Sequence, residues 1–406
     1  MTSYQDILII GGGAAGFFTA INIAEQNPGA NIAILERGKE VLSKVRVSGG
    51  GRCNVTHAEF LPKELSKNYP RGGKELLGPF HQFMTGDTIE WFENRGVALK
   101  IEEDGRMFPV TDSSETIIDC FLSETVRLGI QLLKNHAVKE IRQAEERWEV
   151  FTNQGVFSSK KLVLATGSNP KIWQLLEKLG HRIVPPVPSL FTFNIKDPRI
   201  ENLAGVAAPA TVKILGTKLA SEGPLLITHW GMSGPGILRL SAWGARELYT
   251  KEYHFQIQVN WLLDLSAEEA LDALKALKFS LAKQFTLKRP QFGLPKRLWH
   301  RLAKASGILE TNTWAELNKT QLHTLAEELT QGVFHVKGKS TFKEEFVTAG
   351  GVELSEVDFK TFQSKLHPSL YFAGEILNID AITGGFNFQN AWTGGFLIAK
   401  SFAEKE

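Results

Sequence analysis

The 406-residue sequence has few cysteines, little net charge and no long apolar run. Its two cysteines, Cys53 and Cys120, are too few for a disulfide framework or a four-cysteine metal site, and no metal site is predicted. The 46 basic and 44 acidic residues leave a formal charge of +2, which predicts no overall attraction to polyanions. No apolar stretch approaches the roughly 20 residues that span a bilayer, and the first residues lack the features of a secretory signal. These absences predict a cytoplasmic protein without membrane contact.

A nucleotide-binding pattern is present at the N-terminus. The apolar run QDILII meets the glycine-rich turn GGGAAG (residues 11–16), and residues 17–26 have the pattern of a helix. In such a strand–turn–helix unit, Gly11 allows the tight turn, Gly13 lets a pyrophosphate approach the backbone, and Gly16 lets the helix pack on the strand. The helix N-terminus offers free N–H groups and a partial positive charge to the phosphate.

A second buried strand, NIAILERG (residues 31–38), ends near Glu36, which lies 20 residues after Gly16. At that spacing a carboxylate can accept hydrogen bonds from ribose hydroxyls. A glycine-rich turn in some other α/β protein is the alternative for the N-terminal pattern, but the acidic residue at this spacing favours a dinucleotide.

Two further strands end in glycines. KLVLA (residues 161–165) runs into Thr166-Gly167, and YFAGE (residues 371–375) ends in a glycine and a carboxylate. DAITGGFN (residues 380–387) follows, and residues 388–403 have the pattern of a final helix. The dipole and free amides of that helix would suit the pyrimidine side of a flavin, where negative charge develops on reduction.

The stretch VRVSGGGRCNVTH (residues 45–57) contains three consecutive glycines, which cost backbone entropy. A glycine loop can lie flat against a planar ring, and Arg52 and Asn54 can supply charge and hydrogen bonds to pyrophosphate or ring oxygens. The alternative is a flexible linker that carries polar residues by chance.

Together these segments resemble one family, the BaiN/RdsA-type NAD(P)/FAD-dependent oxidoreductases, which are YhiN-like flavoproteins. The matching pieces run through nearly the whole chain: GGGAAG (11–16), SGGGRCNVTH (48–57), GRMFP (105–109), LATGSNP (164–170), THWGMSGPGIL (228–238), TAGGV (348–352) and FAGEILNIDAITGGFNFQNAWTGG (372–395). The resemblance implies FAD in the first domain, an inserted substrate region, and NAD(P)H as a transient electron donor. The sequence has no second GxGxxG that would mark a dedicated nicotinamide domain.

The strand ends and the resemblance together predict one set of cofactor-binding residues. The set is Gly11, Gly13, Ala14, Ala15, Gly16, Glu36, Arg37, Lys44, Ser48, Gly49, Gly50, Gly51, Arg52, Cys53, Asn54, Val138, Ala165, Thr166, Gly167, Gly374, Glu375, Asp380, Gly384, Gly385, Phe386 and Asn387. Glu375 and Asp380 have a second interpretation, as groups that take part in proton transfer.

Cys53 and His229 are the two catalytic candidates. Cys53 has no second cysteine within a few residues, which disfavours disulfide exchange; it either donates a proton to the reduced substrate or is a packed thiol near the ring. His229 lies in the glycine-rich loop ITHWGMSGPGIL and is either a packed, hydrogen-bonded histidine or a substrate-facing imidazole.

The predicted fold class is α/β, with a Rossmann-like FAD-binding domain interrupted by an insert. The FAD-binding domain comprises residues 1–188 and 346–406, and the inserted substrate region comprises residues 189–345. Within the insert, short apolar runs alternate with glycine and proline turns over residues 189–262 and 332–345, which predicts a β-barrel-like region. A small helical region is predicted at residues 263–331, and its first helix opens on Ser266 as the N-cap.

One segment of the insert is strongly basic. KQFTLKRPQFGLPKRLWHRLAK (residues 283–304) contains seven Lys or Arg residues, no acidic residue, and three interleaved aromatics, Phe285, Phe292 and Trp299. This composition suits phosphate contacts and base stacking on ribosomal RNA. The predicted RNA-binding residues are Lys288, Arg289, Lys296, Arg297 and Arg301. The alternative is a solvated helical face with its aromatics in the core.

The predicted activity is the transfer of a hydride from NAD(P)H through a flavin to an activated C=C bond. The first substrate hypothesis is a uridine of large-subunit ribosomal RNA, which would become dihydrouridine, and the basic segment favours it. The second is a small enone such as a steroid or bile-acid derivative. A third hypothesis is a flavin-carrying RNA-binding or assembly factor without turnover. The sequence predicts no oligomeric state.

Overall fold

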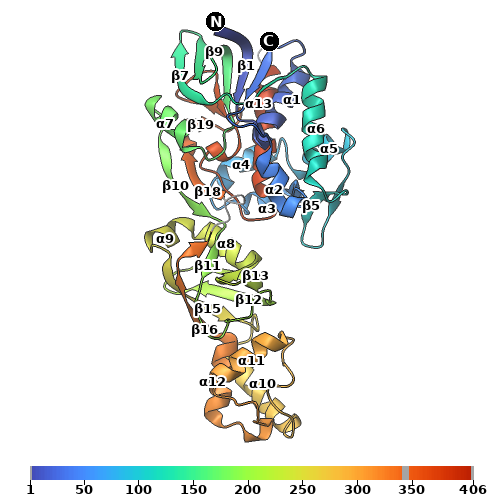
Figure 1. Ribbon diagram of the computed structural model, residues 1–406, viewed down its shortest axis with the longest axis vertical. Coiled ribbons are helices and arrows are strands. Elements are labelled where there is room, and N and C mark those ends of the chain that lie inside the picture. The colour runs from blue at the N-terminus through green and yellow to red at the C-terminus, as the bar shows by residue number, and fades with distance from the viewer. Residues whose placement is uncertain (1, 341–346, 404–406) are drawn as a thin grey trace. The chain divides into compact units, whose positions relative to one another are not determined.

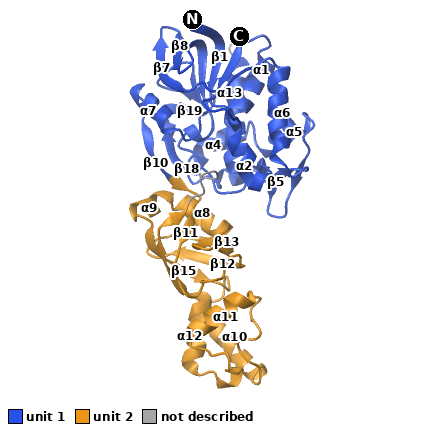
Figure 2. Cartoon of the chain, viewed as in Figure 1, with its two compact units in different colours: residues 1–187, 343–406 blue, residues 188–342 orange. Residues whose placement is uncertain are grey.

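The computed structural model describes residues 2–340 and 347–403, which belong to two compact units (Figures 1 and 2). Unit 1 comprises residues 1–187 and 343–406, and unit 2 comprises residues 188–342. The predicted end of the insert, at residues 345–346, lies outside the described residues. The first and last described residues, Thr2 and Ala403, belong to unit 1 (Figure 2).

The centre of unit 1 is a parallel sheet with the strand order β21-β9-β1-β2-β6. Its strands are β1 (Thr2–Ile10), β2 (Ile32–Leu35), β6 (Gln131–Leu133), β9 (Val156–Leu164) and β21 (Leu370–Phe372). All four residues of β2 are buried, as is typical of a parallel strand with both faces covered. Ile10 pairs in register with Leu35 and Leu164, so these strands end at one edge of the sheet.

Antiparallel strands extend this sheet, and two small sheets accompany it. The additional strands are β19 (Val357–Asp358) and β20 (Gln363–Ser364) beyond β21, and β7 (Val138–Ala144) and β8 (Arg147–Thr152) beside the first half of β9. The small sheets are β10 (Ile183–Ser189) with β18 (Val347–Val352), and β3 (Thr56–His57), β5 (Arg106–Pro109) and β4 (Leu99–Ile101).

The helices α1 (Ala14–Gln26) and α13 (Phe386–Ala403) pack closely against each other in unit 1 (Figure 1). A Cβ atom on Gly395 would lie 2.7 Å from Thr19 Oγ1, so a larger residue would require neighbouring atoms to shift. The other helices of unit 1 are α2 (Ser43–Gly51), α3 (Pro62–Ser66), α4 (Gly73–Phe80), α5 (Thr85–Glu93), α6 (Ser114–Arg127) and α7 (Pro170–Lys178). The strand–turn–helix units and the final helix predicted from the sequence are therefore present.

Unit 2 is built on an antiparallel sheet of seven strands with the order β16-β15-β12-β13-β14-β11-β17. The strands are β11 (Thr192–Asn194), β12 (Ala207–Ile214), β13 (Ala220–Ile227), β14 (Gly231–Ser233), β15 (His254–Asn260), β16 (Gly332–Lys337) and β17 (Lys339–Ser340). β12 alternates exposed and buried residues along most of its length, which places one of its faces on the core of the unit.

Among the described residues of unit 2, five α-helices accompany the sheet: α8 (Pro235–Trp243), α9 (Ala245–Thr250), α10 (Ala267–Ser280), α11 (Lys296–Ala305) and α12 (Lys319–Thr330). The last three lie between β15 and β16 in the chain and pack together (Figure 1). Ser266 caps α10 as predicted, because its Oγ accepts a hydrogen bond from the Glu269 N–H at 3.2 Å. Within the described ranges, no helix has both the length and the apolar character needed to cross a bilayer.

Candidate dinucleotide-binding site

Four of the predicted segments meet at the carboxyl edge of the parallel sheet of unit 1. The Gly11 N–H donates to the Leu35 carbonyl at 2.8 Å, and the Ala165 N–H donates to the Ile10 carbonyl at 2.8 Å. The Ala373 N–H donates to the Leu164 carbonyl at 3.0 Å. The turns after β1, β2, β9 and β21 therefore lie side by side, where open parallel sheets bind their ligands.

The glycines of the first turn differ in what surrounds them. A Cβ on Gly11 would overlap the carbonyl oxygen of Ala165, and a Cβ on Gly16 would overlap that of Gly11, so both are required by the protein's own packing. A Cβ on Gly13 would meet no atom within 4 Å. Gly13 is the N-cap of α1 and has no capping side chain, so the space above it and the helix N–H groups suit a phosphate.

Glu36 is held at the end of β2 by two backbone amides. Its Oε2 accepts from the Gly12 N–H at 2.9 Å, and its Oε1 accepts from the Gly38 N–H at 2.7 Å. Each carboxylate oxygen can accept a further hydrogen bond. The side chain is thus fixed where a ribose hydroxyl could reach it, whereas Arg37 beside it is exposed.

A buried hydroxyl and an ion pair mark the ends of β9 and β21. Thr166 Oγ1 is buried and has no hydrogen-bond partner among the residues that the structure describes. Such a group costs free energy, which indicates a place for an external donor or acceptor. Glu375 is 15% exposed and pairs with Lys44 Nζ at 2.5 Å, so the end of β21 is joined to α2.

The stretch predicted to be a glycine loop is the end of α2. The helix is interrupted at Ser48, Gly49 and Gly50, and Gly49 to Gly51 have φ values of +59°, +70° and +86°. A Cβ on Gly50 or Gly51 would meet nothing within 4 Å, and both residues are exposed. The bare backbone therefore faces open space, as a planar ligand would require, and it forms the end of a helix.

Arg52 is engaged by acidic side chains of its own unit. Its Nη1 lies 2.6 Å from Glu102 Oε1 and 3.4 Å from Asp112 Oδ1, and its guanidinium lies 3.9 Å from the ring centroid of Phe108. Hydrogen bonding to Glu102 is the main cause that raises the pKa of Arg52. The contact with pyrophosphate stays a prediction, and it would require Arg52 to share these partners.

The segment after Cys53 packs against the turn that precedes α13. With its amide nitrogen toward the Thr56 carbonyl, Asn54 donates at 3.0 Å and accepts from the Gly385 N–H at 3.1 Å. The His57 ring stacks on Phe386, with centroids 4.5 Å apart, and its Nδ1 lies 3.1 Å from the Gly384 carbonyl. Burial lowers the pKa of His57 below 6.5. Sequence analysis missed His57, although it closes the quoted glycine stretch.

Asp380 is fully buried and forms a two-pronged ion pair with Arg71, through Arg71 Nε to Oδ1 and Nη2 to Oδ2. Asn387 Oδ1 accepts from the Ala381 N–H at 3.0 Å, which fixes the same turn. The pair favours a structural role for Asp380 over a role as a base near the flavin. Arg71 was also missed, because no motif marks it.

The two catalytic candidates differ in exposure. Cys53 is fully buried, has φ +61°, and burial raises its pKa to about 12. This favours the packed thiol over the proton donor. His229 is exposed in the connection between β13 and β14 of unit 2, so the packed alternative does not describe it.

The predicted cofactor-binding residue Val138 begins β7. It lies two residues after His136, whose N–H donates to the Glu36 carbonyl at 2.8 Å.

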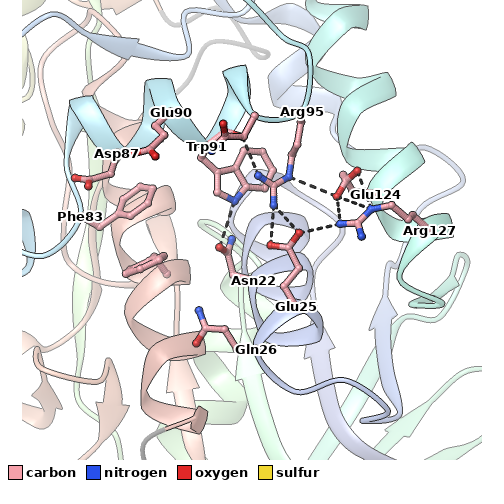
Figure 3. Close-up of a pocket in the computed structure, with 12 residues that line it drawn as sticks. Asn22, Glu25, Gln26, Phe83, Asp87, Glu90, Trp91, Arg95, Glu124 and Arg127 are labelled. Atoms are coloured by element: carbon pink, nitrogen blue, oxygen red, sulfur yellow. Dashed lines mark hydrogen bonds and ion pairs between the residues drawn. The ribbon is translucent and has the colours of Figure 1, made fainter.

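A hollow of about 790 Å³ lies at the C-terminal end of α1, between α1, α5, α6 and α13 (Figure 3). The Arg95 guanidinium lies 3.7 Å from the ring centroid of Trp91 and pairs with Glu25 at 2.7 Å. Asn22 Oδ1 accepts from Trp91 Nε1 at 3.2 Å. These groups contact one another, and none of the predicted cofactor-binding residues lines the hollow.

The basic segment of unit 2 is exposed, but its aromatics are not equally so. Six of its seven Lys and Arg residues are exposed, and Arg301 is half-buried. Trp299 is fully buried, and its Nε1 donates to the Thr286 carbonyl at 3.0 Å, so for this ring the alternative of an aromatic in the core holds and base stacking does not. Phe292 packs against the core, whereas Phe285 is 37% exposed. Arg297 donates to the Asn202 carbonyl.

The fold has counterparts among solved structures. A 3-ketosteroid-delta4-(5alpha)-dehydrogenase from Rhodococcus jostii RHA1 aligns with a TM-score of 0.50 at 12% identity, covering 98% of this chain and 97% of that chain. The sheet, its strand ends and this likeness define the fold class that the sequence predicts, a Rossmann-type α/β fold. The chain belongs to the HI0933-like protein Rossmann domain family, whose model matches residues 5–401.

Two curated relatives cover nearly the whole chain. One is a ribosomal RNA dihydrouridine synthase of Haemophilus influenzae, 28% identical over 420 residues and covering all of both chains. The other is a 3-dehydro-bile acid delta(4,6)-reductase of Clostridium scindens, 27% identical over 413 residues and covering 98% of each chain. The names of both relatives describe enzymes, one a synthase and one a reductase.

Proposed function

We propose that this protein is an FAD-dependent reductase that converts a uridine of large-subunit ribosomal RNA to dihydrouridine, with NAD(P)H as the electron donor. The observation that carries the FAD assignment is the set of strand ends around Gly13, where bare backbone and open space meet the N-terminus of α1. The exposed basic segment of unit 2 supports an RNA substrate. The cytoplasm is the compartment in which ribosomal RNA would be met.

The residues of unit 1 would hold the cofactor in three ways. The Gly13 backbone and the N-terminus of α1 would bind the pyrophosphate, and Glu36 would accept the ribose hydroxyls. Thr166 Oγ1 and the bare backbone of Gly50 and Gly51 would contact the remainder. When bound, FAD supplies hydride transfer, while the protein supplies position, electrostatics and exclusion of water.

The reaction adds two hydrogens across one double bond. A hydride reaches one carbon of the polarised C=C bond, a proton reaches its neighbour, and NAD(P)H is oxidised to NAD(P)⁺. Cys53 does not present an accessible acidic proton, because it is buried and its pKa is raised to about 12. The geometry therefore does not support Cys53 as the proton donor.

A second candidate, the reduction of a small enone such as a bile-acid derivative, is favoured by the bile-acid reductase among the relatives. Such a substrate would have no use for exposed cations without acidic partners. Lys288, Arg289 and Lys296 are of this kind, because none of them has a carboxylate within 4.0 Å among the described residues. The RNA substrate is accordingly our first proposal.

Mass spectrometry of ribosomal RNA from a strain that lacks this protein tests the substrate. We expect one uridine of the large-subunit RNA to lose a mass increment of two hydrogens, and a plasmid copy of the gene to restore it. A plasmid copy with Gly86→Val, a change on an exposed turn of α5, should restore it equally. Identical RNA in the deletion and parent strains would contradict the dihydrouridine assignment and leave the enone reductase.

A further inference from the structure

The helix α10 carries a large apolar side chain in solvent. Phe279 is 83% exposed, whereas Ala270, Leu271 and Leu274 of the same helix are buried in the core of unit 2. Lys275, one helical turn before Phe279, is also exposed. The phenyl ring therefore stands on the outer face of the helix, away from the core of unit 2.

Basic residues lie near this ring in the sequence. Residues 273–309 contain nine Lys or Arg and no acidic residue. Lys283, Lys288 and Arg289 follow Phe279 in the chain and are exposed, and in the described parts of the chain none has a carboxylate within 4.0 Å. A group of cations without acidic partners suits a polyanion.

A second ring lies within this charged segment. Phe285 is 37% exposed, and the Lys288 ammonium lies 4.4 Å from its ring centroid. Exposed rings and cations therefore alternate over residues 279–289. Bases stack on exposed aromatic rings while neighbouring cations bind the phosphates, and this arrangement is typical of surfaces that bind single strands.

We propose that Phe279, Lys283, Phe285, Lys288 and Arg289 form a surface that binds unpaired RNA, with bases stacked on the two rings and phosphates on the three cations. We call it the α10 surface. The proposal rests on the proposed RNA substrate and specifies its form, because the bases of a duplex hide the faces that a ring would contact. An anionic bilayer fits less well, since Asp272 and Lys275 share the outer face of α10 with Phe279 and interrupt its apolar area.

The test is the fluorescence anisotropy of labelled RNA with the full-length, FAD-loaded protein. The probes are a 12-nucleotide uridine- and adenosine-containing strand and the same strand in a duplex. We expect Phe279→Ala to weaken single-strand binding on the order of 10-fold without changing its salt dependence, because stacking involves no counterion release. Phe279→Trp should restore binding, Phe279→Leu should not, and Val126→Ala, at an 82% exposed residue of unit 1, should change nothing.

The cations give a complementary signature. The double variant Lys288→Gln, Arg289→Gln should lower the slope of log affinity against log salt by roughly 1.4, about 0.7 for each phosphate contact to a single strand. Equal affinity for strand and duplex, wild-type affinity in Phe279→Ala, or binding to phosphatidylserine vesicles in place of RNA would each overturn the proposal. The binding assay involves no turnover. Unaltered dihydrouridine in the deletion strain would therefore reject the proposed enzymatic function but would not decide whether the α10 surface binds RNA.

Discussion

Replacing Gly13 with valine should lower FAD affinity by on the order of 100-fold or more while the protein remains folded. The side chain would extend into the open space above Gly13, because a Cβ there has no neighbour within 4 Å. It would, however, keep the pyrophosphate from the N-terminus of α1. The loss of two charge-assisted hydrogen bonds at about 1.5–3 kcal/mol each corresponds to at least that factor.

The measurement is isothermal titration of FAD into apoprotein, together with thermal unfolding of the same apoprotein. Gly86→Val is the matched control, since Gly86 also lies at a helix start with no atom within 4 Å of its Cβ position. Gly11→Ala provides the contrast, because its Cβ would overlap the Ala165 carbonyl and should lower the unfolding temperature. Wild-type FAD affinity in Gly13→Val would place the pyrophosphate elsewhere.

Replacing Arg71 with methionine should lower the free energy of unfolding by about 3–5 kcal/mol. The substitution removes the guanidinium that holds both oxygens of Asp380, a fully buried carboxylate. Breaking a buried ion pair costs more than replacing both partners, so the double variant Arg71→Met, Asp380→Asn should recover much of the loss.

Urea unfolding of the apoprotein measures this effect. Arg46→Met is the matched control, because Arg46 pairs with Glu115 at the surface, where both side chains are about half exposed. Exposed pairs contribute about 0–1 kcal/mol, so this variant should unfold almost like the wild type. If Arg71→Met and Arg46→Met have the same small effect, the Arg71–Asp380 pair does not stabilise the turn before α13.

The parts of the site that the sequence predicted are those encoded locally. A short apolar run, a glycine turn and a helix pattern are enough to predict β1, Gly11 to Gly16 and α1, because each element contributes its own signal. Arg71 and His57 were missed because their partners, Asp380 and Gly384, lie 309 and 327 residues away. Contacts at that separation depend on the tertiary fold.

The basic segment shows a different limit. Its composition indicated phosphate contacts, but composition does not tell which ring faces solvent. The stripe Leu298, Trp299, Leu302 and Ala303 has helical spacing and is buried, so the period of α11 could have placed Trp299 in the core. Phe279 lies outside the segment. Its exposure depends on how α10 packs on the rest of unit 2, which composition does not indicate.

Titration of purified apoprotein with FAD tests most directly whether the strand ends of unit 1 hold one flavin. We expect one FAD bound per chain and a yellow protein whose flavin absorbance survives gel filtration. A colourless protein that takes up no FAD would contradict it.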